Sequence, residues 1–176
     1  FLQRTAEVYP NHKSIIHGHR TYTWSETYKR SCQLASALSS SGIGEKDTVS
    51  VLAFNTPEIY EAHFAIPMLG AVINTINIRL DIETISYILD HAETKALITD
   101  TELSPTMKEV IKKINKEILI INICDDQALQ PDGAGEMIGE IEYEKFLHSG
   151  NENFEWSLPK DEWESIALNY TSGTTG

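Results

Sequence analysis

Short β-branched runs alternate along the chain with segments whose apolar residues recur every three or four positions. The strand-like runs are TVSVLAF at 48–54, AVINTIN at 71–77, KALIT at 95–99 and EILIINI at 117–123. Helical periodicity fills the stretches between them, with apolar stripes such as Leu103, Met107, Val110, Ile111 and Ile114. This alternation predicts the α/β class, with a mostly parallel sheet flanked by helices.

Turn and capping residues predict the boundaries of the first elements. KSIIHGHRTYTW at 13–24 indicates two short strands around a turn at 17–19. A helix should then begin with a capping box, Thr23 as N-cap and Glu26 three residues later, and end at Gly42 in a left-handed cap. The residues expected on its buried stripe are Trp24, Tyr28, Cys32, Ala35 and Leu38.

Three further helices are expected between the later strands. The segment 57–70 is apolar on nearly all sides, so it should be sandwiched, and Pro67 should kink or end it. His63 within it is interpreted as a hydrogen-bonded core histidine. Asp81 is expected to cap the next helix, and Thr101 to open the one after that.

The last third of the chain changes in composition. Residues 125–140 are rich in acidic residues, glycine and proline, which predicts an exposed connector with no packed role. Residues 143–147 are expected to add one or two helical turns. SIALNY at 165–170 alternates apolar and polar residues, which indicates a strand that leads directly into TSGTTG at 171–176.

The charge balance narrows the range of binding partners. Lys and Arg together number 14 and Asp and Glu 26, which gives a formal net charge of −12. Such an acidic chain gains nothing from the electrostatic attraction of nucleic acid or of anionic membranes. No apolar run approaches the length of a membrane span, and the two cysteines fit a reducing compartment. An intracellular protein is expected, with cytoplasm and peroxisome both open.

The terminal run has the chemistry of a phosphate-binding loop. Gly173 and Gly176 permit close approach of the backbone to a ligand. Hydroxyl donors come from Thr171, Ser172, Thr174 and Thr175, and converging hydroxyls and backbone amides can hold several anionic oxygens. The run does not fit the nucleoside-triphosphatase pattern GxxxxGK[ST]. From composition alone, a Ser/Thr/Gly linker remains the alternative.

Other polar residues have simpler interpretations. His17 and His19 flank a turn without a third ligand, so a solvated hairpin is favoured over a metal site. The adjacent acids Asp125 and Asp126 are expected to be hydrated. Ligands of parallel sheets gather at the carboxyl ends of strands, which makes three residues at the end of the 71–77 strand and just beyond it weaker candidates, although turn formation is the simpler account. They are Asn74, Asn77 and Arg79.

YTSGTTG, late in a long α/β region, resembles the first half of the signature of the adenylate-forming (AMP-binding) enzymes. Three upstream blocks, TYTWSETYKRSCQLASAL, GIGEKDTVSVLAFNTPEIYEAHFAIPMLGAVINTINIRL and ISYILDHAETKALITD, are similar to that family in order and spacing. The likeness spans nearly all of the chain and is weakest at 125–160. It is nearest to the plant acyl-activating enzymes, which are acyl-CoA synthetases.

The resemblance implies the N-terminal part of an ATP-dependent acyl-CoA synthetase. Its substrates would be a small carboxylic acid, ATP with Mg²⁺, and coenzyme A. The resemblance assigns the grip on the β- and γ-phosphates to Thr171, Ser172, Gly173, Thr174, Thr175 and Gly176. Residues 1–176 would form a partial adenylation domain that stops within this loop, with no complete second domain. The family's catalytic and metal-binding residues lie further on, so the 176 residues alone are expected not to activate an acid.

Two other interpretations remain open. The same fold serves adenylation domains that load a carrier protein and luciferase-type oxygenases, and a fused carrier domain would distinguish the first of these. The chain is also compatible with a truncated, non-catalytic binding module.

Overall fold

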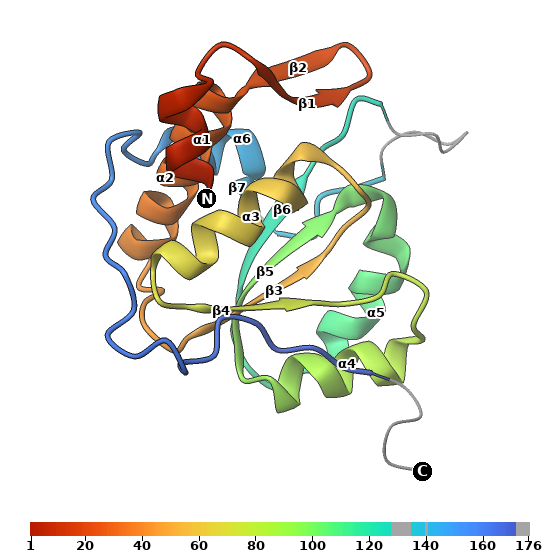
Figure 1. The fold of residues 1–176 in the computed structure, drawn as a ribbon. Coiled ribbons are helices and arrows are strands. Elements are labelled where there is room, and N and C mark those ends of the chain that lie inside the picture. The colour runs from red at the N-terminus through yellow and green to blue at the C-terminus, as the bar shows by residue number, and fades with distance from the viewer. Residues whose placement is uncertain (128–134, 140, 172–176) are drawn as a thin grey trace.

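Five parallel strands form the central sheet in a computed structural model that describes residues 1–127, 135–139 and 141–171 (Figure 1). The order across the sheet is β4-β3-β5-β6-β7, and each neighbouring pair is parallel. The strands are β3 (Thr48–Leu52), β4 (Val72–Thr75), β5 (Thr94–Asp100), β6 (Leu119–Ile123) and β7 (Ile141–Glu142). The predicted α/β class is confirmed; β7, only two residues long, was not expected.

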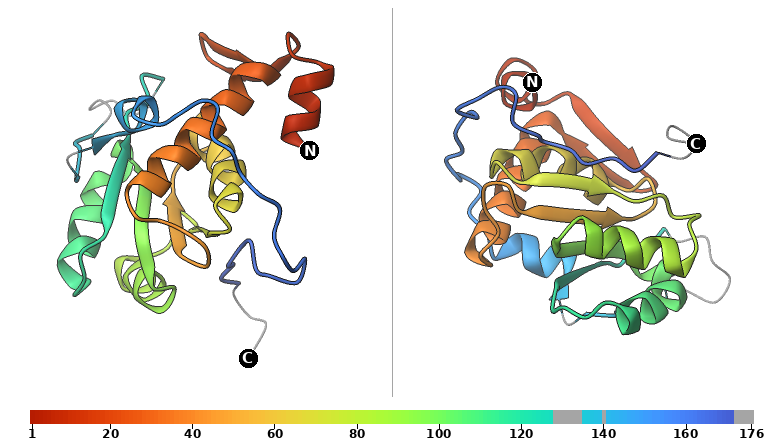
Figure 2. Two further views of the ribbon diagram at one scale, coloured as in Figure 1. Left: turned by 90° about the vertical axis from the view of Figure 1, so that its left-hand side faces the viewer. Right: turned by 90° about the horizontal axis from the view of Figure 1, so that it is seen from below.

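Helices cover both faces of this sheet (Figure 2). One apolar cluster joins one face to α2 (Trp24–Ser40), α3 (Pro57–Met68) and α6 (Tyr143–His148). A second cluster joins the other face to α4 (Ile82–His91) and α5 (Ser104–Lys113). The central strands β3 and β5 are buried at every residue except Lys95, as expected for parallel strands with helices on both faces.

The N-terminal part adds a helix and a hairpin at one end of the sheet. Helix α1 (Leu2–Val8) was not expected from the sequence. The antiparallel hairpin of β1 (Lys13–His17) and β2 (Arg20–Thr23) was expected, and Gly18 in its turn has a φ of +56°. This positive φ explains the choice of glycine there.

The expected helix caps are confirmed, with two adjustments. Thr23 and Glu26 form the capping box, Asp81 accepts a hydrogen bond from the Thr84 amide, and Gly42 has a φ of +85°. Residues 101–103 form a 3-10 turn, η1 (Thr101–Leu103), before α5 begins. The buried stripe of α2 is shifted, because Trp24 and Tyr28 are half-buried while smaller neighbours take the core positions; these include Thr27, Ser31, Leu34 and Ala37.

Helix α3 corrects one expectation and confirms another. The helix ends at Met68, directly after Pro67, as predicted. His63 is exposed, so its interpretation as a core histidine is wrong; its Nδ1 lies 2.7 Å from the carbonyl oxygen of Ile59. The polar side chains that α3 does bury are Glu58 and Glu61, which the sequence did not single out.

The stretch after β6 is not the unpacked connector that its composition suggested. Asp125 is buried, and the Ile138 amide donates to Asn122 Oδ1 at 2.9 Å. Ile138 also packs against the apolar cluster below the sheet. The stretch is therefore packed at Asp125 and Ile138, whereas Asp126 and residues 135–137 are exposed, as expected.

Candidate functional site

The segment that leads to TSGTTG runs beside β4, at the edge of the sheet (Figures 1 and 2). Ala167 forms a parallel bridge with Ile73, through Ile73 N–H to the Ile166 carbonyl at 3.0 Å and Leu168 N–H to the Ile73 carbonyl at 2.9 Å. The predicted strand at 165–170 is thus reduced to one bridge. The direction of this segment agrees with the prediction, because a segment that runs parallel to β4 leads towards the carboxyl ends of the strands.

Tyr170, the last residue before the loop sequence, is attached to α4. Its hydroxyl lies 2.7 Å from His91 Nδ1, and its ring meets the His91 ring edge-on at a centroid distance of 5.8 Å. Thr171 follows and is exposed. The other predicted phosphate-binding residues, Ser172, Gly173, Thr174, Thr175 and Gly176, lie outside the described residues.

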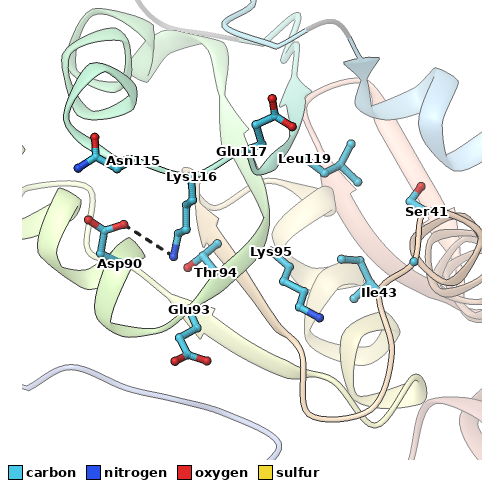
Figure 3. Close-up of a pocket in the computed structure, with 11 residues that line it drawn as sticks. Ser41, Ile43, Asp90, Glu93, Thr94, Lys95, Asn115, Lys116, Glu117 and Leu119 are labelled. Carbon is cyan, nitrogen blue, oxygen red and sulfur yellow. Dashed lines mark ion pairs between the residues drawn. The ribbon is translucent and has the colours of Figure 1, made fainter.

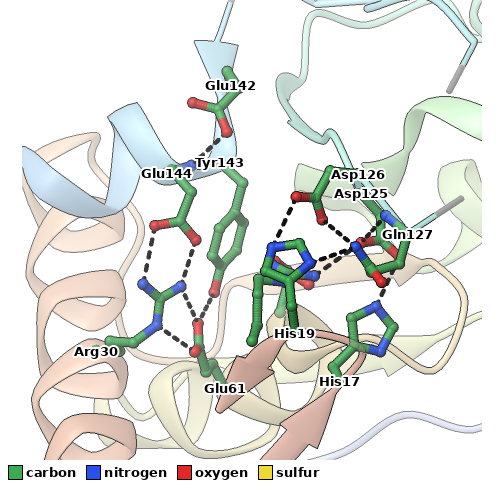
Figure 4. Close-up of polar contacts among 12 residues, drawn as sticks. His17, His19, Arg30, Glu61, Asp125, Asp126, Gln127, Glu142, Tyr143 and Glu144 are labelled. Atoms are coloured by element: carbon green, nitrogen blue, oxygen red, sulfur yellow. Dashed lines mark hydrogen bonds and ion pairs between the residues drawn. The ribbon is translucent and has the colours of Figure 1, made fainter. Parts of the chain in front are cut away.

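The carboxyl ends of β3, β5 and β6 carry a cluster of buried charged residues (Figure 4). Arg20 reaches in from the hairpin and donates to Glu58 Oε1 at 2.6 Å and to Asp125 Oδ1 at 3.0 Å. His17 Nε2 lies 2.8 Å from Asp125 Oδ2. The hydrated acid pair and the solvated hairpin expected from the sequence are therefore wrong for Asp125 and His17, which hold each other in a largely buried contact.

Asp100, at the end of β5, belongs to the same region. Its side chain accepts a hydrogen bond from the Glu102 amide at 2.9 Å. Burial raises the pKa of Asp100 to about 6, and the neighbouring carboxylates of Glu102, Asp125 and Glu58 add to that rise. Asp100 therefore holds a proton more readily than an ordinary aspartate does.

Several buried oxygen atoms around Asp100 make no hydrogen bond within the described protein. They are Thr56 Oγ1, Glu58 Oε2, Thr99 Oγ1, Asp100 Oδ2 and Thr101 Oγ1. Buried polar groups are nearly always hydrogen-bonded. This end of the sheet therefore has spare hydrogen-bonding capacity. No local pattern in the sequence points to Glu58 or Asp100, because their environment is made by residues far away in the chain.

The opposite end of the sheet holds a surface depression of about 770 Å³ where β5 and β6 begin (Figure 3). Its lysines are already matched by protein groups. Lys95 Nζ lies 2.6 Å from Asp47 Oδ1, and Lys116 Nζ donates to the Leu89 carbonyl at 2.8 Å. With its lysines paired in this way, the depression offers neither Lys95 nor Lys116 as a free cation for an anionic ligand.

The weaker candidates after β4 have structural roles. Asn74 is buried and donates to Ser50 Oγ at 2.9 Å, inside the sheet. Asn77 Oδ1 accepts the Arg79 amide at 2.9 Å, which is the turn that the sequence suggested as the simpler account. Asn77 therefore serves the turn, and Asn74 serves the inside of the sheet, where its Oδ1 has no hydrogen-bond partner among the described residues.

A metal ion is not supported by the described part of the chain. Within residues 1–127, 135–139 and 141–171, no three His, Cys, Asp or Glu side chains are placed to hold one. Nor does any helix among them have the length and apolar character needed to cross a membrane.

Comparison with known proteins shows the family. Residues 2–176 match the AMP-binding enzyme family. Over 99% of its length the chain is 45% identical to an acetate–CoA ligase of Humulus lupulus and 43% identical to a peroxisomal acetate/butyrate–CoA ligase of Arabidopsis thaliana. It covers 32% of each of these relatives, so it spans about a third of their length.

Solved structures agree on the fold. The chain superposes on an anthranilate–CoA ligase in complex with anthranoyl-AMP with a TM-score of 0.81, at 24% identity, over 99% of this chain and 32% of that one. A Mycobacterium tuberculosis fatty acyl CoA synthetase gives a TM-score of 0.75 at 21% identity, over 97% and 32%. The chain belongs to the AMP-binding enzyme family, and its sheet is that of the family's N-terminal region.

Proposed function

We propose that the protein containing this chain is an ATP-dependent acyl-CoA synthetase that activates a small carboxylic acid. The observation that carries the proposal is the family match over residues 2–176, together with identities of 45% and 43% to proteins named as acetate–CoA and acetate/butyrate–CoA ligases. Another relative, 42% identical, is a trans-cinnamate:CoA ligase of Petunia hybrida. Short-chain and aromatic acids are therefore the substrate classes to test first.

The chemistry proceeds in two steps. The oxide that a free carboxylate would have to expel is a poor leaving group. The carboxylate therefore attacks the α-phosphate of ATP, which releases pyrophosphate and forms an acyl-adenylate. The thiol of coenzyme A then takes the acyl group and AMP leaves. Both steps depend mainly on placing the reactants and stabilising developing negative charge.

This chain's contribution is binding of the triphosphate at residues 171–176. In this proposal Thr171, Ser172, Thr174 and Thr175 donate hydroxyl hydrogen bonds to the β- and γ-phosphates, and Gly173 and Gly176 allow backbone amides to approach them. The path of the described chain supports it, since the Ile73–Ala167 bridge directs residues 168–171 along β4 towards the carboxyl end of the sheet. Mg²⁺ enters with ATP on its phosphates. Residues 1–176 are proposed to be the front part of the adenylation domain.

The test uses the full-length protein. Wild type should catalyse ATP–pyrophosphate exchange that depends on an added acid, and should form an acyl-CoA when coenzyme A is present. Gly173→Val places a side chain where phosphate must approach, and kcat/KM for ATP should fall about 100-fold or more. Gly44→Val is the matched control, because a Cβ at Gly44 meets nothing within 4 Å. Unchanged ATP affinity and turnover in Gly173→Val would remove the phosphate role from the loop.

The alternative activities give different products in the same assays. A domain that loads a carrier protein would catalyse exchange but form no acyl-CoA. A luciferase-type enzyme would consume oxygen after adenylation. A non-catalytic binding module would show no exchange with any acid. For location, we propose the peroxisome or the cytoplasm, the former because a relative at 43% identity is named as peroxisomal.

A further inference from the structure

The chain makes few contacts between its last strand-like bridge and the loop sequence. Beyond Leu168, the backbone bonds to β4 stop. Asn169 is exposed, and Tyr170 is half-buried against the apolar cluster of α4 and α5. Tyr170 is therefore the side chain that fixes the path of the chain immediately before residue 171.

Tyr170 docks on His91 of α4, which in turn stacks on Tyr87 one helical turn earlier. His91 Nδ1 lies 2.7 Å from the Tyr170 hydroxyl, and the two rings meet at an interplanar angle of 78°. On its other side His91 stacks on Tyr87, with ring centroids 5.2 Å apart and an interplanar angle of 22°. Tyr87 restricts the orientation of the His91 ring, which in turn fixes the direction of the hydrogen bond to Tyr170.

Helix α4 is a rigid support for this contact. Asp81 caps its N-terminus by accepting hydrogen bonds from the Thr84 amide and hydroxyl at 2.9 and 2.8 Å. On the buried side Ile85, Ile88 and Leu89 are at most 2% exposed. Side chains held by such packed elements define a binding site more exactly than side chains on loops do.

We propose that Tyr170 and His91 are a positioning pair: they fix the chain that enters residues 171–176 and so favour the conformation that binds the phosphates of ATP. The inference rests on the proposed function. Loss of the pair lets the entry to the loop sample other orientations, and ATP binding must then restrict them. The effect is expected on ATP and not on coenzyme A or the acid, because the phosphates of ATP are the groups that the proposed function assigns to residues 171–176.

The experiment compares steady-state constants of the full-length enzyme. Tyr170→Phe removes the hydroxyl and keeps the ring, and should raise KM for ATP about three- to tenfold, the range of one hydrogen bond. Tyr170→Ala removes both and should have a larger effect. His91→Phe should match Tyr170→Phe, and the double variant should be no worse than either single one, since both remove the same bond. KM for coenzyme A should stay within twofold throughout.

Controls separate positioning from general destabilisation. Tyr9→Phe and His63→Gln change an exposed tyrosine and an exposed histidine away from α4 and should leave KM for ATP unchanged. If thermal stability changes in Tyr170→Phe and His91→Phe while KM for ATP does not, the contact is purely structural. That result would overturn the proposal that Tyr170 and His91 are a positioning pair. If Tyr170→Ala does not fold, the two phenylalanine variants decide the matter. A wild type without ATP–pyrophosphate exchange would overturn the proposed function and this inference together, whereas an active wild type with unaffected variants overturns only the inference.

Discussion

Arg30 in α2 and Glu61 in α3 form a buried ion pair, with Arg30 Nε 2.5 Å from Glu61 Oε1 and the Glu61 side chain fully buried (Figure 4). The other edge of the guanidinium contacts Glu144 in α6 at 2.5 and 2.9 Å. Tyr143 donates its hydroxyl to Glu61 at 2.8 Å, and the Tyr22 ring faces the guanidinium at 4.7 Å. Three helices and the hairpin thus meet at one cation.

Arg30→Met should destabilise the protein strongly. Burial opposes the charge of Arg30, but its contacts with Glu144 and Glu61 outweigh this and raise the pKa of Arg30. Burial already raises the pKa of Glu61 to about 7 in the presence of Arg30. Without the cation, Glu61 must either stay charged in the interior or take up a proton, and breaking such a buried pair costs about 3–5 kcal/mol in free energy of unfolding. Urea denaturation of the full-length protein measures it. The neighbouring Lys29→Met breaks an exposed pair with Glu152 and should cost less than about 1 kcal/mol. Equal losses in the two variants would contradict the buried-pair account.

The raised pKa of Asp100 predicts that the stability of the protein depends on pH. Its pKa is raised to about 6 in the folded protein, mainly by burial, against a reference of 3.8. The folded state therefore binds the proton more tightly than the unfolded chain does. The contribution of Asp100 to the free energy of unfolding is fully present below pH 3.8. This contribution, about 2–3 kcal/mol in total, is lost as the pH rises through about 6.

Asp100→Asn tests this assignment because it keeps the shape of the side chain and removes its titration. Its free energy of unfolding relative to wild type should improve between pH 4 and pH 8. Asp126→Asn should change in the opposite direction, because a hydrogen bond from Gln127 lowers the pKa of Asp126. If the difference between wild type and Asp100→Asn is flat across this range, Asp100 titrates normally.

Asp125 should hold the β1–β2 hairpin to the end of the sheet. Asp125→Ala removes the contacts to Arg20 and His17 and leaves both donors in a largely buried site, at a cost of about 2–3 kcal/mol. Amide hydrogen exchange of residues 13–23 should accelerate at least tenfold. The adjacent Asp126 is 59% exposed, so Asp126→Ala should leave the exchange of the hairpin nearly unchanged. Similar exchange in the two variants would show that the hairpin is held by other contacts.

Gly150 lies so close to the backbone of α2 that there is no room for a side chain at this position. A Cβ at this position would collide with the carbonyl oxygen of Gln33 in α2. Gly150→Ala should therefore lower the free energy of unfolding by about 1–3 kcal/mol through forced displacement of the 149–151 turn. Gly44→Ala, which meets open space, is the control and should be neutral. A stable Gly150→Ala protein would show that the turn moves without penalty.

Local sequence signals predicted the secondary structure well because they act over a few residues. The capping box at Thr23, the cap at Asp81 and the helix end after Pro67 all depend on neighbours within four positions. The failures concern long-range contacts. Asp125 is buried by Arg20, which is 105 residues away in the chain, and Glu61 by Arg30 and Tyr143, 31 and 82 residues away.

The candidate site divides in the same way. The run of glycine and hydroxyl residues at 171–176 was visible in the sequence, and so was its place after an apolar segment. The docking of Tyr170 on His91, 79 residues apart, was not, because α4 and the final segment meet only through the order of the sheet. Periodicity identified the buried face of α4 but says nothing about which later residue packs beside it.

The bridge between Ile73 and Ala167 has a practical consequence for making shorter versions of this protein. Among the described strands, β4 is the outermost on its side of the sheet, and residues 166–168 lie along its outer edge. A shortened protein whose C-terminus lies before Ser165 would lack the segment that pairs with β4. The unpaired amide and carbonyl groups of β4 could then bind other molecules. Such a shortened protein should self-associate and accumulate in inclusion bodies. A version that retains residues 165–170 should not, because this segment still covers the outer edge of β4.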